Sequence, residues 1–202
     1  DLNGMNQIDP RMAKAECRRM LREARKALSA DQQQQVAVDL LNHLSALPDL
    51  SQFKNIAAYW AADGELSCRA VMPHLQQQGT NILLPLIQDD KSLRFGLYEN
   101  EEQLSKNRYG IPEPRLDDGA ERIPDCILMP LVGVDKQGRR LGMGGGFYDR
   151  TLARIMENGQ RPVLIGMAHD CQLCESLPAE DWDISVDWVW TPSRAWCCLP
   201  SK

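Results

Sequence analysis

The spacing of apolar residues predicts two amphipathic helices near the start of the chain. Apolar side chains recur at steps of three and four from Pro10 to Leu28, which is the period of a helix with one buried face. Ser29 is followed three residues later by Gln32, the pattern of a capping box, and apolar residues continue at helical spacing as far as Pro48. We therefore expect one helix over Pro10 to Leu28 and a second from Ser29 to Pro48.

Beyond these helices, short buried runs alternate with helical stretches. The predicted strands are residues 55–60, 81–87, 93–98 at an edge, 126–134, 163–168 and, as the last one, 186–190. The predicted helices between them are residues 66–78 and 147–157. This alternation is typical of α/β folds, so we expect a mostly parallel sheet flanked by helices, with the ligand site at the carboxyl ends of the strands. No internal repeat or linker is evident, which predicts a single domain over residues 1–202.

A glycine-rich segment, DKQGRRLGMGGGFYDR at residues 135–150, joins a predicted strand to a predicted helix. Glycine permits positive φ angles and a close approach of backbone to ligand, and N–H groups ahead of a helix can cradle an anion. Arg139 and Arg140 could neutralise phosphate charge there, and Asp149 could hold a divalent cation. The segment lacks the standard phosphate-loop and dinucleotide-binding patterns, and a flexible turn is the simpler explanation of its glycines. Its place between strand and helix favours a phosphate site.

The first predicted helix carries a second candidate for anion binding. Lys14, Arg18 and Arg22 stand four residues apart and therefore share one face. Taken alone, such a stripe is more often a solvated face than a binding site. The remaining basic residues of this helix, which we assign to a solvated face, are Arg19, Arg25 and Lys26.

Composition and charge limit the partners that the chain can have. Its 202 residues are 43% hydrophobic and 25% charged, an ordinary globular mixture that excludes a disordered chain. A formal net charge of -5 disfavours non-specific binding to nucleic acid or anionic lipid, so any anion site must be local. No apolar run is long enough to span a membrane. We expect a cytoplasmic monomer with no nucleic-acid or membrane partner. We assign no structural role to the residues before Met5, and we expect residues 1–9 to be disordered or extraneous to the fold.

The seven cysteines are interpreted as reduced thiols, because their number is odd and several lie inside apolar runs. A zinc site is the alternative for His169, Cys171 and Cys174, whose side chains are soft ligands. The pattern is incomplete, since no second pair of cysteines at this spacing accompanies it. We expect His169 and Gln172 to lie on a loop at a strand end near the nucleotide or in a local hydrogen-bond network.

With these features in view, the chain resembles the 5-formyltetrahydrofolate cyclo-ligase family, also called the 5,10-methenyltetrahydrofolate synthetases, in its shorter bacterial form. The resemblance covers most of the chain in family order. Its most specific part is the glycine-rich segment with its flanks, DCILMPLVGVDKQGRRLGMGGGFYDRTL. The weaker parts are KAECR, YWAADGEL, YGIPEP, AHDCQL and WDISVD.

The resemblance implies an ATP-dependent reaction that requires Mg²⁺, converts 5-formyltetrahydrofolate into 5,10-methenyltetrahydrofolate and releases ADP and phosphate. Transfer of the γ-phosphoryl group to the formyl oxygen would make that oxygen a good leaving group, so that N10 could attack the activated carbon. Such catalysis depends on positioning and charge stabilisation and needs no protein nucleophile. A non-catalytic nucleotide- or RNA-binding module that uses the same loop for phosphates is the alternative.

The resemblance also implies a set of site residues, with Lys14 and Arg140 in catalysis. It assigns ATP to Lys14, Arg18, Arg140, Leu141, Gly142, Met143, Gly144, Gly145, Gly146, Phe147 and Tyr148. It assigns the folate to Trp60, Glu65, Met143 and Tyr148, and the metal to Asp149 and Asp187. In this assignment Trp60 offers an aromatic wall to the pterin, and Glu65 accepts hydrogen bonds from its N–H groups.

Overall fold

The computed structural model of the chain describes residues 4–9, 12–116, 120–178 and 183–198. Within these residues the central sheet consists of β1 (Asn55–Ala57), β2 (Asn81–Ile87), β3 (Leu93–Tyr98), β6 (Cys126–Pro130), β9 (Val163–Met167), β11 (Trp188–Trp190) and β12 (Ala195–Cys197). The strands lie in the order β12-β11-β9-β6-β1-β2-β3. Neighbours along the chain are thus not always neighbours in the sheet, as expected when helices connect the strands.

The inner strands of this sheet are parallel, whereas both edge strands are antiparallel. β1 pairs in parallel with β2 and β6, and β9 pairs in parallel with β6 and β11. At the two edges, β3 runs antiparallel to β2 and β12 runs antiparallel to β11. The prediction of a mostly parallel sheet with residues 93–98 at an edge is therefore confirmed. The strand order reverses between β1 and β6, because the chain extends the sheet beyond β1 first and beyond β6 afterwards.

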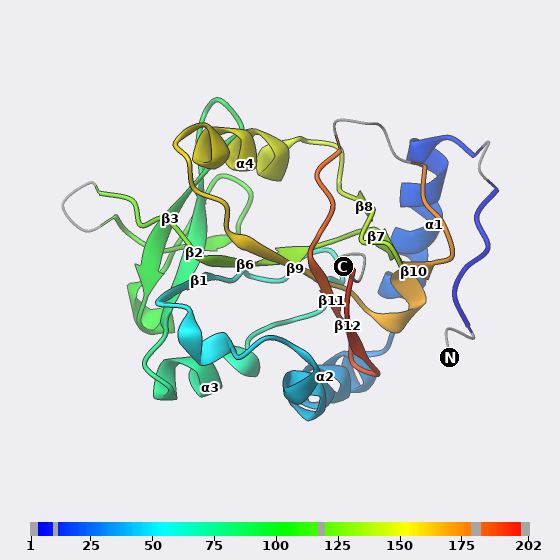
Figure 1. Ribbon diagram of the computed structural model, residues 1–202, viewed down its shortest axis with the longest axis horizontal. Coiled ribbons are helices and arrows are strands. Elements are labelled where there is room, and N and C mark those ends of the chain that lie inside the picture. Colours follow the sequence, from blue (N-terminus) through cyan, green and yellow to red (C-terminus); the bar gives the residue numbers. More distant parts are fainter. Residues whose placement is uncertain (1–3, 10–11, 117–119, 179–182, 199–202) are drawn as a thin grey trace.

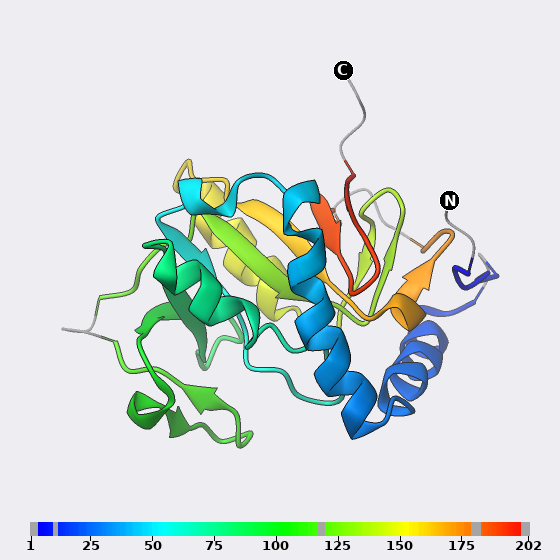
Figure 2. The same ribbon diagram turned by 90° about the horizontal axis from the view of Figure 1, so that it is seen from below.

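Helices cover both faces of the sheet and one end of it. The α-helices of the described residues are α1 (Lys14–Lys26), α2 (Ala30–Asp39), α3 (Val71–Gln77) and α4 (Phe147–Glu157). α4 lies on one face, and α2 and α3 lie on the other (Figure 1). Figure 2 shows the second face from below, with α2 and α3 lying across the strands. The prediction of helices flanking the sheet is confirmed by this arrangement.

α1 stands at the carboxyl ends of the parallel strands, beside a second, smaller sheet (Figure 1). The strands of this sheet, in spatial order, are β10 (Leu173–Cys174), β7 (Gly133–Asp135) and β8 (Arg140–Leu141). Cys17 and Leu21 of α1 are buried against Leu141 and Cys174. Gly133 permits this contact, because a Cβ there would lie 2.6 Å from the Leu21 side chain. The small sheet therefore fixes the place of α1.

Alternate side chains of the inner strands enter two apolar layers. Ile82 and Leu84 of β2 pack in the layer that contains α3, whereas Leu83 packs in the layer that contains Leu152 and Ile155 of α4. β2 is thus buried on both faces, as expected for a strand in a sheet that helices cover on both sides. The continuous apolar run in its sequence has the same cause.

The first three α-helices are shorter than the apolar periodicity predicts. α2 ends at Asp39, and the chain continues as the 3-10 helix η1 (Leu40–Ala46) instead of an α-helix to Pro48. The third predicted helix begins only at Val71. Before it, the Leu66 carbonyl accepts a hydrogen bond from the buried hydroxyl of Tyr59. Tertiary contacts of this kind override helical spacing at the ends of a segment.

Three strand predictions also differ from the structure, the first because β1 ends at Ala57 and not at residue 60. Residues 126–134 form two strands, because the chain leaves the central sheet after Pro130 and enters the small sheet at Gly133. β11 is not the last strand, since β12 folds back beside it. The remaining short elements are η2 (Leu50–Gln52), η3 (Glu101–Gln103), β4 (Ser105–Lys106), β5 (Pro112–Glu113) and η5 (Asp170–Gln172).

Part of the opening segment packs into the fold, contrary to the expectation that residues 1–9 are disordered or extraneous to it. Asn6 forms a parallel bridge with Cys174, and its side-chain amide donates to the Leu173 carbonyl at 2.9 Å. Ile8 is buried in the cluster that holds α1. A segment this short carries no periodic signal, so only its pairing with β10 shows that it contributes. In the part of the chain that the structure describes, no helix has the length and apolar character needed to cross a bilayer.

Trp190 offers a test of the apolar layer beneath the sheet. Its side chain is 0% exposed, and its indole Nε1 donates to the Leu40 carbonyl at 3.0 Å. Trp190→Ala should lower the free energy of unfolding by about 3–5 kcal/mol, because it opens a large cavity. Urea unfolding measures this change. Val38→Ala, at a side chain that is 52% exposed, should change the value by less than about 0.5 kcal/mol, and equal losses would contradict the assigned core.

Candidate functional site

The reversal of strand order between β1 and β6 brings the sequence candidates to one end of the sheet. The loop after β1 contains residues 60–65, and the connection after β6 contains the glycine-rich segment. Ligands of open α/β sheets bind outside the carboxyl ends of the strands at such a reversal. α1 lies at the same end (Figure 1). Three separate parts of the sequence therefore converge there.

α1 contacts the glycine-rich segment directly. The Arg18 guanidinium donates from Nε to the carbonyl of Gly142 at 2.7 Å. Gly144 has a φ of +93°, which favours glycine, and a Cβ there would lie 3.5 Å from Cζ of Arg18. The two anion-binding candidates of the sequence, the basic helix face and the glycine-rich segment, thus lie against each other.

The glycine-rich segment ends at the N-terminus of α4. Gly146, with a φ of 72°, is the N-cap residue, and no side chain of the described residues caps the helix. The first N–H groups of α4 are therefore left as donors at this end of the sheet. Arg150 donates from Nη1 to the Gly145 carbonyl at 2.7 Å, which holds the preceding turn against the helix. The segment combines free backbone donors with nearby guanidinium groups.

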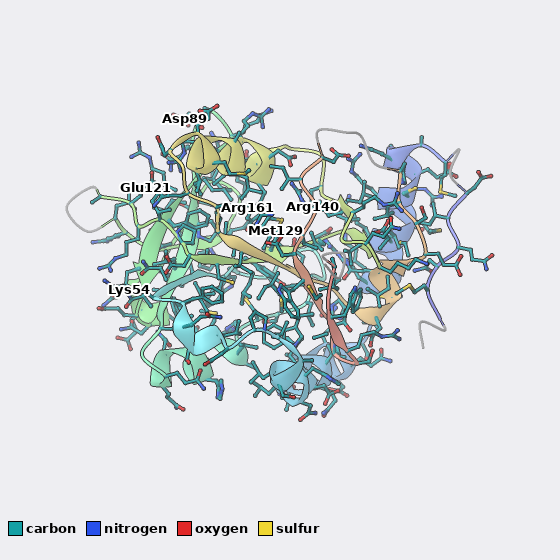
Figure 3. The ribbon with its side chains drawn as sticks, viewed as in Figure 1. Lys54, Asp89, Glu121, Met129, Arg140 and Arg161 are labelled. Atoms are coloured by element: carbon teal, nitrogen blue, oxygen red, sulfur yellow. The ribbon has the colours of Figure 1, made fainter. Side chains whose placement is uncertain are left out.

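Lys14 and Arg140, the two predicted catalytic residues, converge on one short segment. Arg140 donates from Nε to the Ile184 carbonyl at 2.8 Å, and its Nη2 forms an ion pair with the carboxylate of Asp149. Lys14 forms an ion pair with Asp183, the residue before Ile184, at 3.1 Å. Figure 3 labels Arg140 in the region between α4 and α1. Both cations are held by carboxylates in this arrangement.

Among the predicted folate-binding residues, the charge of Glu65 acts on the hydroxyl of Tyr148. Oε2 of Glu65 accepts from the backbone N–H of Ala62 at 3.0 Å, and burial raises the pKa of the carboxyl group. Burial also raises the pKa of the Tyr148 hydroxyl, and the negative charge of Glu65 adds to that shift. The hydroxyl therefore stays protonated and can donate a hydrogen bond, whereas the Glu65 carboxylate can accept one.

Trp60 and Met143, the other predicted folate-binding residues, each lie beside an arginine. The Arg69 guanidinium carbon is 4.5 Å from the centroid of the Trp60 ring, and Arg69 also forms an ion pair with Glu101. The side chain of Met143 is 51% exposed, and its Sδ lies 3.9 Å from Nη2 of Arg25. Cations stacked on an aromatic ring or packed on a thioether keep these apolar groups in place at the surface.

Asp187 lies apart from Asp149, although the resemblance assigns both to the metal. Its two oxygens accept from Arg161 at 2.9 and 3.1 Å, and one of them also accepts from the N–H of Leu164 at 2.8 Å. Asp187 precedes β11, and Arg161 precedes the parallel strand β9, so this ion pair lies at the amino ends of the strands. Arg161 is labelled in Figure 3. The two acids are thus bound by different arginines.

His169 and Gln172 belong to a local hydrogen-bond network at the end of β9, as predicted. Gln172 donates from Nε2 to the carbonyls of Leu131 and Val132 at 2.7 and 2.9 Å, and its Oε1 accepts from the N–H of His169 at 2.9 Å. Nε2 of His169 is 3.1 Å from the Gly64 carbonyl, and burial lowers the pKa of this imidazole. Among the described residues, no three His, Cys, Asp or Glu side chains gather to hold a metal, which gives the zinc alternative no support.

Arg25 is not part of a solvated face, so that prediction is wrong. Its side chain is 0% exposed and pairs with Asp63 at 2.9 Å. Position 25 lies four residues after the buried Leu21 and therefore on the apolar face of the helix. This spacing is the sequence signal that indicates burial of Arg25. Arg22 and Lys26 also pair with Asp63. The hydrogen bond from Arg22, with those from Lys26 and Arg25, holds the pKa of Asp63 far below its ordinary 3.8.

Fold and site together define an α/β protein in which a basic helix and a glycine-rich segment meet at the strand-order reversal of a parallel sheet. The model of the 5-formyltetrahydrofolate cyclo-ligase family matches residues 10–192, so the chain belongs to this family. The 5-formyltetrahydrofolate cyclo-ligase of Escherichia coli is 38% identical over 183 residues, which cover 88% of this chain and 99% of that protein. The Haemophilus influenzae cyclo-ligase is 39% identical over 172 residues, or 82% of this chain and 90% of that protein. The solved structure of Aquifex aeolicus 5,10-methenyltetrahydrofolate synthetase matches with a TM-score of 0.79 and 27% identity, over 95% of each chain.

The carboxylate of Asp63 predicts a pH-dependent contribution to stability. A depressed pKa in the folded state means that the contribution is fully present above the ordinary pKa of 3.8 and is lost as the pH falls below it. Asp63→Asn should therefore lower the free energy of unfolding by about 1–3 kcal/mol at neutral pH and by less in acid. Urea unfolding at about pH 7, 5 and 3 measures the difference.

The exposed ion pair between Arg19 and Glu23 provides the control for this experiment. The two side chains are 63% and 64% exposed, so water screens their attraction. Glu23→Gln should change the free energy of unfolding by less than about 0.5 kcal/mol at any of these pH values. A loss in Asp63→Asn that stays constant with pH would contradict the charge-based explanation.

Proposed function

We propose that this chain uses ATP to convert 5-formyltetrahydrofolate into 5,10-methenyltetrahydrofolate, with release of ADP and phosphate. Membership of the cyclo-ligase family gives the reaction. The contact between Arg18 and Gly142 is the structural observation that supports it most, because it joins the basic helix to the segment that would surround a triphosphate. A cytoplasmic location and a monomeric state stay predictions from the sequence.

The reaction requires that the formyl oxygen of the folate become a leaving group. Transfer of the γ-phosphoryl group breaks the bond between the γ-phosphorus and ADP, and a new bond joins this phosphorus to the formyl oxygen. N10 of the folate then forms a bond to the formyl carbon and releases its proton to water, and the oxygen leaves as phosphate. All of these bonds form between substrates, so the protein acts by holding them and by stabilising charge.

Three cations are assigned to the phosphate groups of ATP. Lys14 and Arg140 would stabilise charge on the transferring phosphoryl group, and Arg18 would hold the glycine-rich segment against the nucleotide. Since Lys14 and Arg140 pair with Asp183 and Asp149, phosphate oxygens would take the place of carboxylate oxygens when ATP binds. The residues assigned to ATP around them are Leu141, Gly142, Met143, Gly144, Gly145, Gly146, Phe147 and Tyr148.

The carboxylate of Asp149 fits a hard divalent cation such as Mg²⁺. Its side chain is 60% exposed in the first turn of α4, where its oxygens can reach a cation that also binds phosphate oxygens. Mg²⁺ at this place would neutralise charge on the phosphates. Asp187 fits less well, because Arg161 and Leu164 occupy its oxygens at the other end of the strands. We infer that Asp187 fixes the start of β11.

The folate is assigned to the loop after β1 and to the start of α4. The carboxylate of Glu65 would accept hydrogen bonds from the pterin N–H groups, and the protonated hydroxyl of Tyr148 would donate one. Trp60 would contribute a flat apolar surface, with Arg69 on one of its faces. Met143 would extend this surface from the glycine-rich segment toward ATP. The formyl group would then lie between the residues assigned to ATP and the residues assigned to the folate.

An activity assay distinguishes the ligase from a module that only binds phosphates. Folded protein with ATP, Mg²⁺ and 5-formyltetrahydrofolate should produce methenyl absorbance and ADP in equal amounts. Arg140→Ala should reduce turnover by about 10²–10³-fold, because it removes a charge that stabilises the transferring group. Arg19→Ala, at an exposed site, should keep full turnover. Nucleotide binding by the folded wild-type chain without any methenyl product would favour the binding module.

Glu65→Gln tests the folate side of the site separately. The variant keeps the shape of the side chain but loses its charge, so the KM for 5-formyltetrahydrofolate should rise about tenfold or more. The KM for ATP should change less than about twofold. Because burial raises the pKa of Glu65, the wild-type KM for folate should begin to rise on acidification at a pH above the ordinary glutamate value of 4.5. Equal increases of both KM values would point to structural damage.

A further inference from the structure

Arg25 is a buried cation that the proposed reaction does not use. Its side chain is 0% exposed. Nε and Nη2 donate to the carbonyl and the carboxylate of Asp63 at 2.8 and 2.9 Å, and Nη1 donates to the Leu131 carbonyl at 3.2 Å. A buried guanidinium is strongly unfavourable unless its donors are paired. These contacts therefore fix α1 relative to Asp63 and to the end of β6.

The turn that contains Asp63 also places Glu65, which is assigned to the folate. Asp63 and Gly64 have φ angles of 53° and 75°, so both adopt the left-handed conformation. The backbone N–H of Glu65 donates to the Ala62 carbonyl at 2.9 Å, and its carboxylate accepts from the Ala62 N–H at 3.0 Å. Because the turn is closed by these bonds, a displacement of Asp63 moves the Glu65 carboxylate with it.

The same helix contacts the part of the site that is assigned to ATP. Arg18 binds the Gly142 carbonyl, and Nη2 of Arg25 lies 3.9 Å from Sδ of Met143. Arg18 and Arg25 are seven residues apart, about two helical turns, and so share one face of α1. A helix moves as a rigid rod over this length. The contacts of α1 with the glycine-rich segment and with the Asp63 turn therefore change together.

We propose that Arg25 and Asp63 are positioning residues that couple the two substrates, so that bound ATP strengthens folate binding and bound folate strengthens ATP binding by the same factor. This inference rests on the proposed function, because it takes ATP to the glycine-rich segment and folate to Glu65. Bound ATP holds α1 against the glycine-rich segment. Arg25, as part of α1, then keeps Asp63 in place, and the turn that contains Asp63 positions the Glu65 carboxylate for the folate. The substrate that binds first thereby places the groups that the second one needs.

Arg25 differs from the other two cations at Asp63 in being buried and in making a second contact, with the loop after β6. The side chains of Arg22 and Lys26 are 37% and 50% exposed, whereas that of Arg25 is fully buried. Arg25 also joins Asp63 to Leu131, the first residue after β6. Arg22 and Lys26 thus add charge around one carboxylate, while Arg25 connects the two loops that flank the strand-order reversal.

The experiment measures the affinity for the Mg²⁺ complex of adenylyl imidodiphosphate, a non-hydrolysable ATP analogue, with and without saturating 5-formyltetrahydrofolate. The wild-type chain should bind the analogue about tenfold more tightly when the folate is present. Asp63→Asn and Arg25→Lys should bring this ratio close to one, while the affinity for each ligand alone changes less than about threefold. Asparagine tolerates the left-handed conformation, and lysine keeps the charge but lacks the fork of donors.

Glu121→Gln is the matched control for a loss of stability without a loss of coupling. Glu121 pairs with Arg154 of α4 and is 20% exposed, against 23% for Asp63. The Glu121→Gln variant should keep the tenfold ratio of analogue affinities with and without folate, even if its thermal unfolding temperature falls as far as that of Asp63→Asn. The double variant of Arg25→Lys and Asp63→Asn should lose no more coupling than either single variant, because the pair acts as a unit.

Retention of the tenfold ratio by folded Asp63→Asn would overturn the inference, as would an equal loss of coupling in Glu121→Gln. If Asp63→Asn does not fold, Arg25→Lys decides the same question. A wild-type chain that binds both ligands with a ratio near one would overturn the coupling and leave the proposed function intact. A folded wild-type chain that binds neither ligand would overturn both.

Discussion

The pairing of β1 with β6 is the constraint on which the site depends. Because these neighbours belong to opposite halves of the strand order, the segments that follow them go to opposite sides, one into the Asp63 turn and the other into the small sheet. α1 fills the end of the sheet between them, where Arg18 contacts the glycine-rich segment and Arg25 contacts the Asp63 turn. Without that pairing, the segments that carry the candidate residues would not come together at one end of the sheet.

Charge pairing explains how an acidic chain forms a local site for anions. The net charge is -5, yet Lys14, Arg18 and Arg140 gather at one end of the sheet. Two of these cations pair with carboxylates, Asp183 and Asp149, whose own side chains stay partly exposed. Phosphate oxygens are equivalent acceptors with more charge, so an exchange of partners costs little reorganisation.

The prediction of the fold succeeded where periodicity is strong and failed where partners are distant. The helix over Phe147–Glu157 and the edge strand over Leu93–Tyr98 match the predicted bounds, because apolar spacing and flanking breakers fix them locally. The chain's departure from the central sheet after Pro130 depends on pairing with β10, about 40 residues later, which no local pattern reveals. Arg25 was misassigned for a related reason: its partner, Asp63, is 38 residues away.

The sequence by itself determined the α/β class, the family and the identity of the candidate groups, because alternating periodicity and a long glycine-rich segment are local properties of the chain. Only the tertiary structure decided which of these groups meet. It brought Arg18 to Gly142, set Asp187 on Arg161 at the amino ends of the strands, and buried Arg25 against Asp63. Contacts between distant segments depend on strand order and packing, and these arise only when the whole chain buries its apolar faces at once.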